Sequence, residues 1–245
     1  MSLSDYEVDR LSRAQNQEID KLAEEKLISF IAPQESETLL DAGCGTGVNI
    51  LRLHSRVKEI FGIDFSSGSL ERCQRRIQEY GVKNASIQEA SVTAIPLPSR
   101  SVDKILCLSV LHYLNDQEAR QALTEFLRVL RPGGILVFHV KNLSSLYWVT
   151  LSPVKQMKSF LKKGKLIEHV RPFQWYADEL KSLQCSIVDY DSFNLFTVDV
   201  MPEKLFSAVR GFEIKHHANL FFRSPYIRRH GAELMIKAKV QRSMC

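Results

Sequence analysis

The fold of this chain is decided by the stretch Thr38-Leu39-Leu40-Asp41-Ala42-Gly43-Cys44-Gly45-Thr46-Gly47. Apolar Leu39 and Leu40 precede a turn crowded with glycine, a pattern typical of a buried strand that runs into a helix. Glycine at positions 43, 45 and 47 removes the Cβ atoms that would keep the backbone away from a ligand. We expect the following helix, over residues 48–56, to direct its free N–H groups at this turn. The stretch therefore predicts a ligand-binding βα unit.

The glycine spacing excludes two common nucleotide sites. A dinucleotide fingerprint, G-x-G-x-x-G, would need a third glycine where Val48 stands. A P-loop would need lysine followed by Ser or Thr, and Val48-Asn49 supplies neither. What remains is D-x-G-x-G-x-G, with Asp41 ending the strand. A carboxylate there suits a ligand that carries an ammonium group and no phosphates.

This pattern resembles motif I of the class I S-adenosylmethionine-dependent methyltransferases, in its common D-x-G-C-G-T-G form. The resemblance runs from Thr38 to Val140, a little under half of the chain, and is nearest to the type 11 enzymes, such as those of ubiquinone and menaquinone biosynthesis. It implies S-adenosyl-L-methionine as the cofactor, S-adenosyl-L-homocysteine as the product and no metal. The ammonium group of the cofactor's methionine end is the group that Asp41 suits.

The second predicted strand, residues 59–64, supplies the ribose contact. Its terminal Asp64 lies 17 residues after Gly47, and the resemblance assigns it both ribose hydroxyls. Phe65 follows, placed to lie against adenine, and Ser66 begins a helix that runs to about Tyr80.

The adenine contact departs from the family. Where relatives have Asp in D-A-x-x-L-P-F, this chain has Ser91. A hydroxyl can accept the same hydrogen bond, but more weakly than a charged acceptor. Glu89, two residues upstream, is the alternative acceptor.

The fourth predicted strand leads to the reaction centre. Residues 101–109 resemble the family's F-D-x-V strand, and residues 110–114 resemble the L-H-H-L segment, with Tyr113 in place of the second histidine. In the family, the end of this strand faces the sulfonium. We therefore expect the cofactor to be held by Asp41, Gly43, Cys44, Gly45, Thr46, Gly47, Asp64, Phe65, Ser66, Ser91, Val92, Leu108 and Ser109.

A general base is needed only if the acceptor must lose a proton. His112 is the first candidate for that base, and His139, at the end of the fifth strand, is the second. For each, a purely structural role is the alternative.

The resemblance implies an α/β fold with a Rossmann-like, doubly wound sheet of seven strands, in the order 3-2-1-4-5-7-6 with strand seven antiparallel. We expect one methyltransferase domain over residues 1–245, with a helical N-terminal cover (1–37), a cofactor-binding core (38–140) and a half that shapes the substrate site through small capping insertions (141–245). Apolar periodicity and turn residues predict helices at 1–32, 66–80, 117–130 and 175–183, and strands at 86–90, 135–140, 186–190 and 234–240, with the turn Arg131-Pro132-Gly133-Gly134 before strand five.

Two segments favour specific roles around the site. Tyr6 and Arg13 are the residues of the N-terminal cover that could close over the cofactor. Residues 151–165 predict a lysine-rich amphipathic helix. Such a helix can cover an acceptor or lie on an anionic membrane surface, and we expect the cover.

Composition indicates an ordinary globule. The 245 residues are 44% apolar and 25% charged, without a membrane span or a signal pattern at Met1-Ser2-Leu3. Five cysteines without a C-x-x-C pair favour a reducing compartment, so we expect the cytoplasm. Oligomeric state stays open.

Charge is uneven along the chain. Residues 1–140 carry 16 Lys and Arg against 19 Asp and Glu, whereas residues 141–245 carry 17 against 9. A basic, aromatic-rich second half raises the alternative of an RNA methyltransferase, although no RNA-binding module or N-P-P-Y motif is present. A solvated helical face is the other explanation.

We therefore expect methyl transfer to a small-molecule acceptor, with nucleic acid disfavoured as a partner. The apolar residues between 193 and 226 favour a hydrophobic or aromatic acceptor, whose accepting atom (O, C or N) stays open. A non-methylating enzyme of the same fold, an aminopropyl transferase or a cyclase, is the remaining alternative.

Overall fold

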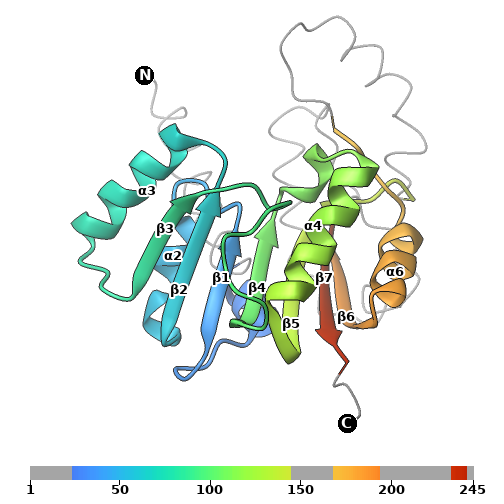
Figure 1. Cartoon of the computed structure of the whole chain (residues 1–245), viewed down its shortest axis with the longest axis horizontal. Helices are drawn as coiled ribbons and strands as arrows, with labels where there is room; N and C mark the ends of the chain where they lie inside the picture. The colour runs from blue at the N-terminus through green and yellow to red at the C-terminus, as the bar shows by residue number, and fades with distance from the viewer. Residues whose placement is uncertain (1–23, 145–167, 194–232, 242–245) are drawn as a thin grey trace, which may run out of the picture.

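A seven-stranded sheet forms the centre of the molecule (Figure 1). The computed structural model describes residues 24–144, 168–193 and 233–241. The strands are β1 (Thr38–Ala42), β2 (Glu59–Asp64), β3 (Ala85–Glu89), β4 (Val102–Leu108), β5 (Leu130–Lys141), β6 (Cys185–Phe193) and β7 (Glu233–Val240). Their order is β3-β2-β1-β4-β5-β7-β6; β1 to β5 are parallel, and β7 runs antiparallel to both β5 and β6. The predicted fold and strand order are confirmed.

Helices cover both faces of the sheet. They are α2 (Val48–Leu53), α3 (Ser67–Glu79), α4 (Asp116–Val129) and α6 (Phe173–Ser182), with 3-10 turns η1 (His54–Arg56) and η2 (Leu111–Tyr113). On one face, α4 and α6 bury Phe126 and Tyr176 in the same core cluster as Phe138 of β5. On the other face, α2 and α3 bury Ile50 and Cys73 in a second cluster (Figure 1). Two cores on opposite faces account for the nearly continuous apolar sequence of β1 and β4.

The described end of the N-terminal segment packs on the second core. Residues 24–31 are helical, and Leu27, Phe30 and Ile31 are buried in the cluster that contains Met235 of β7. Lys26 forms an ion pair of 2.5 Å with Asp191 of β6. This end of the predicted helix is therefore part of the sheet's packing. Tyr6, Arg13, the predicted helix at 151–165 and residues 194–226 lie outside the described residues.

Two expected boundaries differ from the structure. The helix expected over residues 48–56 ends at Leu53 and tightens into η1. The turn Arg131-Pro132-Gly133-Gly134 lies inside β5, which begins at Leu130 and shifts its register against β4 between Val102 and Lys104. Gly133 permits this bulge because its φ is +82°. The side chain of Asp103 fixes it by accepting hydrogen bonds from Arg131 (2.5 Å) and from the backbone N–H of Thr38 (2.9 Å).

The helix after β4 begins at Asp116, one residue before its expected start. Asn115 is the N-cap of α4, and its side chain accepts a hydrogen bond from the backbone N–H of Glu118 (3.0 Å). The Glu118 carboxylate accepts one in return from the Asn115 backbone (2.9 Å), which completes a capping box. This cap lies two residues after the end of η2, which carries His112, and fixes where α4 starts.

Candidate active site

The glycine turn after β1 is shaped by close packing at two of its three glycines. Gly43, Gly45 and Gly47 all have positive φ, which L side chains rarely adopt. A Cβ on Gly43 would lie 2.2 Å from Val110 Cγ2, and one on Gly47 would lie 2.5 Å from Cys73 Sγ. A Cβ on Gly45 would meet nothing within 4 Å. The first and third glycines therefore seat the turn against β4 and α3, while Gly45 faces open space where a ligand can approach.

Asp41 is a buried carboxyl group directly beneath this turn. It has no exposed surface, and its oxygens make no hydrogen bond of ordinary geometry among the described residues, although the nearby Asn49 side chain favours the ionised form. Burial and the nearby Asp64 raise the pKa of Asp41 to about 7. An ionised carboxylate in such a place is costly unless it is paired. Asp41 is therefore suited to a cationic ligand group that enters the turn.

Asp64, at the tip of β2, ties the turn to the second strand. One carboxylate oxygen accepts a hydrogen bond from Gly45 N (2.8 Å), and the other accepts one from Ser66 N (2.9 Å). Ser66 in turn caps α3 by accepting from Ser69 N (3.3 Å). Because each carboxylate oxygen has a second lone pair, Asp64 can still accept from a ligand's hydroxyl groups.

The other two side chains of the turn face the protein. The Cys44 side chain is buried in the second core, so only its backbone is available to a ligand. The hydroxyl group of Thr46 accepts a hydrogen bond from Arg76 Nη1 (3.1 Å), which joins the turn to α3. The ligand surface of the turn is therefore mainly backbone.

The expected adenine region is open and flanked by an aromatic ring. Phe65 is 77% exposed, free to stack on a planar ligand. Ser91 is exposed, and its hydroxyl group lies 2.7 Å from Thr93 Oγ1 and accepts from Thr93 N (3.2 Å). Val92 is buried in the first core and offers only its backbone. Ser91 is thus engaged in a local turn, in place of the charged acceptor of the family.

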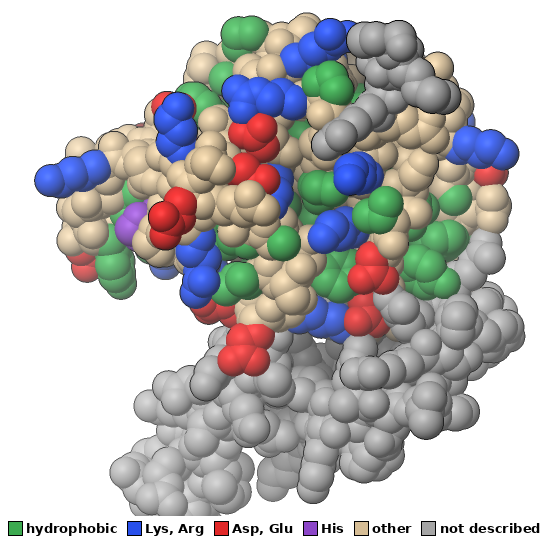
Figure 2. Space-filling model, turned by 90° about the horizontal axis from the view of Figure 1, so that it is seen from below, with side chains coloured by type: hydrophobic (Ala, Val, Ile, Leu, Met, Phe, Trp, Pro, Cys, Tyr) green, Lys and Arg blue, Asp and Glu red, His purple; other side chains and the backbone are tan. Residues whose placement is uncertain are grey.

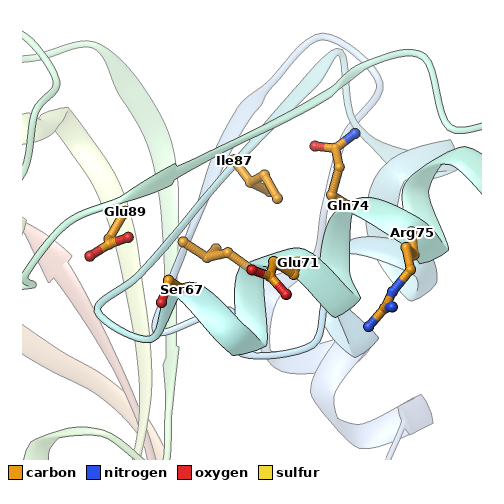
Figure 3. Close-up of a pocket in the computed structure, with 7 residues that line it drawn as sticks. Ser67, Glu71, Gln74, Arg75, Ile87 and Glu89 are labelled. Atoms are coloured by element: carbon orange, nitrogen blue, oxygen red, sulfur yellow. The ribbon is translucent and has the colours of Figure 1, made fainter.

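Glu89, the alternative acceptor, lines a groove between α3 and β3 (Figure 3). It pairs in register with Asp64 of β2. The groove has a volume of about 510 Å³ and is lined by Ser67, Leu70, Glu71, Gln74, Arg75, Ile87 and Glu89. In Figure 3 the Glu89 carboxylate lies near Ser67, at the first turn of α3. The groove therefore adjoins the end of β2 that carries Asp64.

His112 is held inside the protein. Its side chain lies in η2, is only 2% exposed, and its Nδ1 has no hydrogen-bond partner among the described residues. Burial, followed by the nearby Lys141 and His139, lowers the pKa of His112 to about 4. Its ring packs against Tyr113 at 4.3 Å between centroids. His112 is therefore neutral at physiological pH and largely shielded from an acceptor.

His139 is joined to two side chains from neighbouring strands. Its Nδ1 lies 3.1 Å from Ser109 Oγ, just beyond the end of β4, and its Nε2 lies 3.5 Å from Glu233 Oε2 at the start of β7. Ser109 is exposed and has φ of +59°, which is strained for a residue other than glycine. Leu108, which precedes it, pairs in register with His139. The structure thus brings three of the polar side chains at this end of the sheet into one row.

Sequence reasoning named Ser109 and His139 but missed the charged residues around them. Glu233 pairs in register with Lys141, and Lys141 forms a 2.6 Å ion pair with Glu168. Glu233 could have been noticed as an acidic residue at the start of the last predicted strand. Nothing in the sequence pointed to Glu168. The described residues contain no group of three or more His, Cys, Asp or Glu side chains arranged to hold a metal ion.

Charges of both signs alternate over the face seen in Figure 2. Among the described residues there, Lys and Arg side chains lie beside Asp and Glu, with hydrophobic side chains between them. None of the helices that the structure describes is long and apolar enough to cross a membrane.

Comparison with known proteins identifies the domain. A family model described as a methyltransferase domain matches residues 39–134. These residues form a methyltransferase domain. The match spans the glycine turn, Asp41, Asp64, and β4 with η2. The predicted family and its α/β fold are thereby confirmed.

Two curated relatives share part of this domain. The malonyl-[acyl-carrier protein] O-methyltransferase of Serratia marcescens is 29% identical over 142 residues, which cover 56% of this chain and 53% of that protein. The uncharacterized methyltransferase YcgJ of Bacillus subtilis is 34% identical over 103 residues, covering 41% of this chain and 40% of that protein. The chain thus spans about half the length of these relatives.

Solved structures share the fold of the methyltransferase domain over most of the chain. A methyltransferase from Bacillus halodurans has a TM-score of 0.67 at 15% identity, covering 91% of this chain and 99% of the other. Geranyl diphosphate methyltransferase in complex with S-adenosylmethionine has a TM-score of 0.59 at 19% identity, covering 89% of this chain and 84% of the other. The [4+2]-cyclase SpnF has a TM-score of 0.60 at 18% identity, covering 90% and 80%.

Proposed function

We propose that this protein is an S-adenosylmethionine-dependent methyltransferase that acts on a small-molecule acceptor, hydrophobic or aromatic in character. The observation that carries the proposal is the pair of carboxyl groups at the glycine turn: Asp41, buried without a hydrogen bond of ordinary geometry in the described part of the chain, and Asp64 at the tip of β2. Gly45 opens the turn between them. This arrangement fits a ligand with an ammonium group at one end and ribose hydroxyl groups at the other.

The residues present fit S-adenosylmethionine in three respects. Asp41 would pair with its ammonium group, Asp64 would accept from its ribose hydroxyl groups, and Phe65 would stack on its adenine. The cofactor supplies an electrophilic methyl group on a sulfonium. What this chain contributes is alignment of the acceptor and exclusion of water at the ends of β4 and β5.

The relatives support a small-molecule acceptor. The Serratia protein is named for O-methylation of malonyl-[acyl-carrier protein], and the methyltransferase of known structure is named for geranyl diphosphate. A cytoplasmic location stays a prediction.

A cyclase is the second candidate, because SpnF shares this fold. The discriminating measurement is release of S-adenosylhomocysteine when the protein is incubated with S-adenosylmethionine and a panel of apolar alcohols, acids and amines. Methyl transfer releases one S-adenosylhomocysteine for each product molecule, whereas a cyclase releases none.

The cofactor site is tested by thermal unfolding with S-adenosylhomocysteine. Ligand at about a hundred times its Kd should add roughly 2.7 kcal/mol to the free energy of unfolding of the wild type. Asp64→Ala and Asp64→Asn should lose most of this shift, each compared with its own ligand-free unfolding temperature, because the charged acceptor for the ribose is gone.

Asp178→Ala, an exposed carboxylate on α6, is the matched control and should keep the full shift. NAD should shift none of the four proteins. An undiminished shift in both Asp64 variants would contradict the assignment of Asp64.

A further inference from the structure

We propose that Ser109, His139 and Glu233 form a proton relay that serves a hydroxyl group of the methyl acceptor. The acceptor is then an alcohol or a phenol, and the bond formed is an ether. This inference rests on the proposed function, which leaves the accepting atom open.

The relay is built from three strand ends that lie side by side in the sheet. Ser109 follows β4, His139 is in β5, and Glu233 opens β7. The distances are 3.1 Å from Ser109 Oγ to His139 Nδ1 and 3.5 Å from His139 Nε2 to Glu233 Oε2. A carboxylate on the Nε2 side favours the Nε2–H tautomer and leaves the Nδ1 lone pair to accept from the serine hydroxyl. The first contact is a hydrogen bond and the second is an ion-pair distance, and catalytic contacts are often long before a ligand binds.

The position of Ser109 links the relay to the cofactor turn. Ser109 is exposed and adopts φ of +59°, so the chain holds it in a strained conformation at the strand end. The next residue, Val110, is the one that packs against Gly43 of the turn. The serine hydroxyl is therefore one residue away from the backbone on which the methionine end of the cofactor would lie.

The charged groups near His139 suit it to act as the base of the relay. Glu233 on β7 lies 3.5 Å from His139, and the buried His112 on η2 is close enough to His139 for the two rings to interact electrostatically. Lys141 on β5 and Glu168 are charged groups near His112. Lys141 has its own carboxylate in Glu168, at 2.6 Å. His112 is buried. Glu233 is thus the carboxylate placed to stabilise a proton on His139.

Each proton is accounted for. The acceptor O–H donates its proton to Ser109 Oγ as the serine proton passes to His139 Nδ1. The acceptor oxygen bonds to the methyl carbon as the carbon–sulfur bond breaks, and Glu233 stabilises the imidazolium. A carboxylic acid is already ionised at neutral pH and would need no relay. A base therefore points to a hydroxyl acceptor and away from a carboxylate.

The kinetic test uses 2-naphthol and 2-naphthoic acid, which share a ring system and differ in the accepting group. We expect S-adenosylhomocysteine release with the naphthol. His139→Gln should lower kcat by about a hundredfold. Glu233→Gln, which alters only the positioning of His139, should lower it about tenfold with KM changed less than twofold.

Glu179→Gln, a paired carboxylate on α6, is the matched control and should keep the wild-type kcat. The losses of kcat in His139→Gln and Glu233→Gln should become smaller near pH 10. A phenol has a pKa of about 10, as tyrosine does, so at that pH it ionises without a base. Methylation of the acid but not of the naphthol overturns the proposal, and so does an unchanged kcat in both relay variants.

A spectroscopic test of the relay needs no methyl acceptor. In long-range ¹H–¹⁵N spectra of the wild type, we expect the His139 ring as the Nε2–H tautomer, and a mixture of tautomers in Glu233→Gln. If neither naphthalene compound reacts, an Nδ1–H ring in the wild type overturns the relay, and the Nε2–H ring that is lost in Glu233→Gln supports it. Absence of a thermal shift with S-adenosylhomocysteine would count against the proposed function and leave this tautomer test standing.

Discussion

At the scale of single residues, Asp41 links ligand binding to stability. Its pKa is raised from 3.8 to about 7 by burial and by Asp64, so the folded protein binds this proton more tightly than the unfolded chain does. A group with a raised folded pKa contributes stability that is fully present below the unfolded pKa. That stability is lost as the pH rises through about 7. The ligand-free protein therefore carries an unpaired buried charge at and above neutral pH.

Asp41→Asn should remove the loss of stability that the ionised, buried Asp41 causes. We expect the ligand-free variant to unfold at a higher temperature than the wild type at pH 7.5, with the difference much smaller at pH 4. The measurement is thermal unfolding of both proteins across this range in one buffer series. Equal pH dependence of the two proteins would show that Asp41 has a partner in solution.

The same substitution should also weaken binding of the cofactor. The stabilising shift from S-adenosylhomocysteine should be larger for the wild type at pH 7.5 than at pH 5.5, because binding of the ammonium group requires ionised Asp41. In Asp41→Asn the shift should be small at both pH values. Calorimetric titration at the two pH values checks it, and a pH-independent affinity in the wild type would contradict the pairing.

At the scale of elements, Arg171 joins the segment before α6 to η2 and to the start of α4. It is 4% exposed and donates hydrogen bonds to the carbonyl groups of Leu111 (3.1 Å) and Leu114 (2.6 Å) and to Asp116 (2.8 Å). Its guanidinium also lies 4.7 Å from the ring centre of Trp175. Arg171 thus holds η2, which carries His112, against the other half of the chain.

Arg171→Ala should lower the free energy of unfolding by about 3 kcal/mol or more, because it leaves buried carbonyl groups unpaired. Arg120 offers a matched control, since it lies over the same Trp175 ring at 5.5 Å but has a side chain that is 52% exposed. Arg120→Ala should cost at most about 1 kcal/mol. Urea unfolding of both variants measures the difference, and equal losses would contradict the role of Arg171.

The elements and the cofactor side of the site were largely predictable from sequence. A glycine turn after an apolar strand and an Asp at the tip of the next strand are local signals, and Asp41 and Asp64 lie where those signals put them. The bulge in β5 was missed because Pro132 and Gly133 indicate a turn as well as they indicate a bulge.

The acceptor side was only half predictable. Glu233 meets His139 through the antiparallel register of β5 and β7, which are separated by more than ninety residues of sequence. Register between distant strands leaves no mark in a single sequence. Sequence reasoning ranked His112 ahead of His139 as a candidate base, without any signal that the His112 side chain would be buried.

At the scale of the whole molecule, the sheet divides into central and edge strands. β1, β4, β5 and β7 are each paired on both sides, as is β2, whereas β3 and β6 are the edges. In native-state hydrogen exchange we expect the slowest amides in β1, β4 and β7, and faster exchange in β3, whose residues are mostly exposed. Mass spectrometry of peptic peptides checks this order, and a β7 that exchanges as fast as β3 would contradict its central place.

The insertion of β7 between β5 and β6 also has a consequence for biosynthesis. A ribosome delivers β5 and β6 before β7, so a nascent chain carries two long strands whose inner edges cannot pair until residues 233–240 have emerged. Unpaired edges recruit other strands, and contacts between distant segments form slowly. The period before residues 233–240 emerge is thus when this chain is most exposed to misassembly. β7, which pairs with both of these edges, also places Glu233 beside His139.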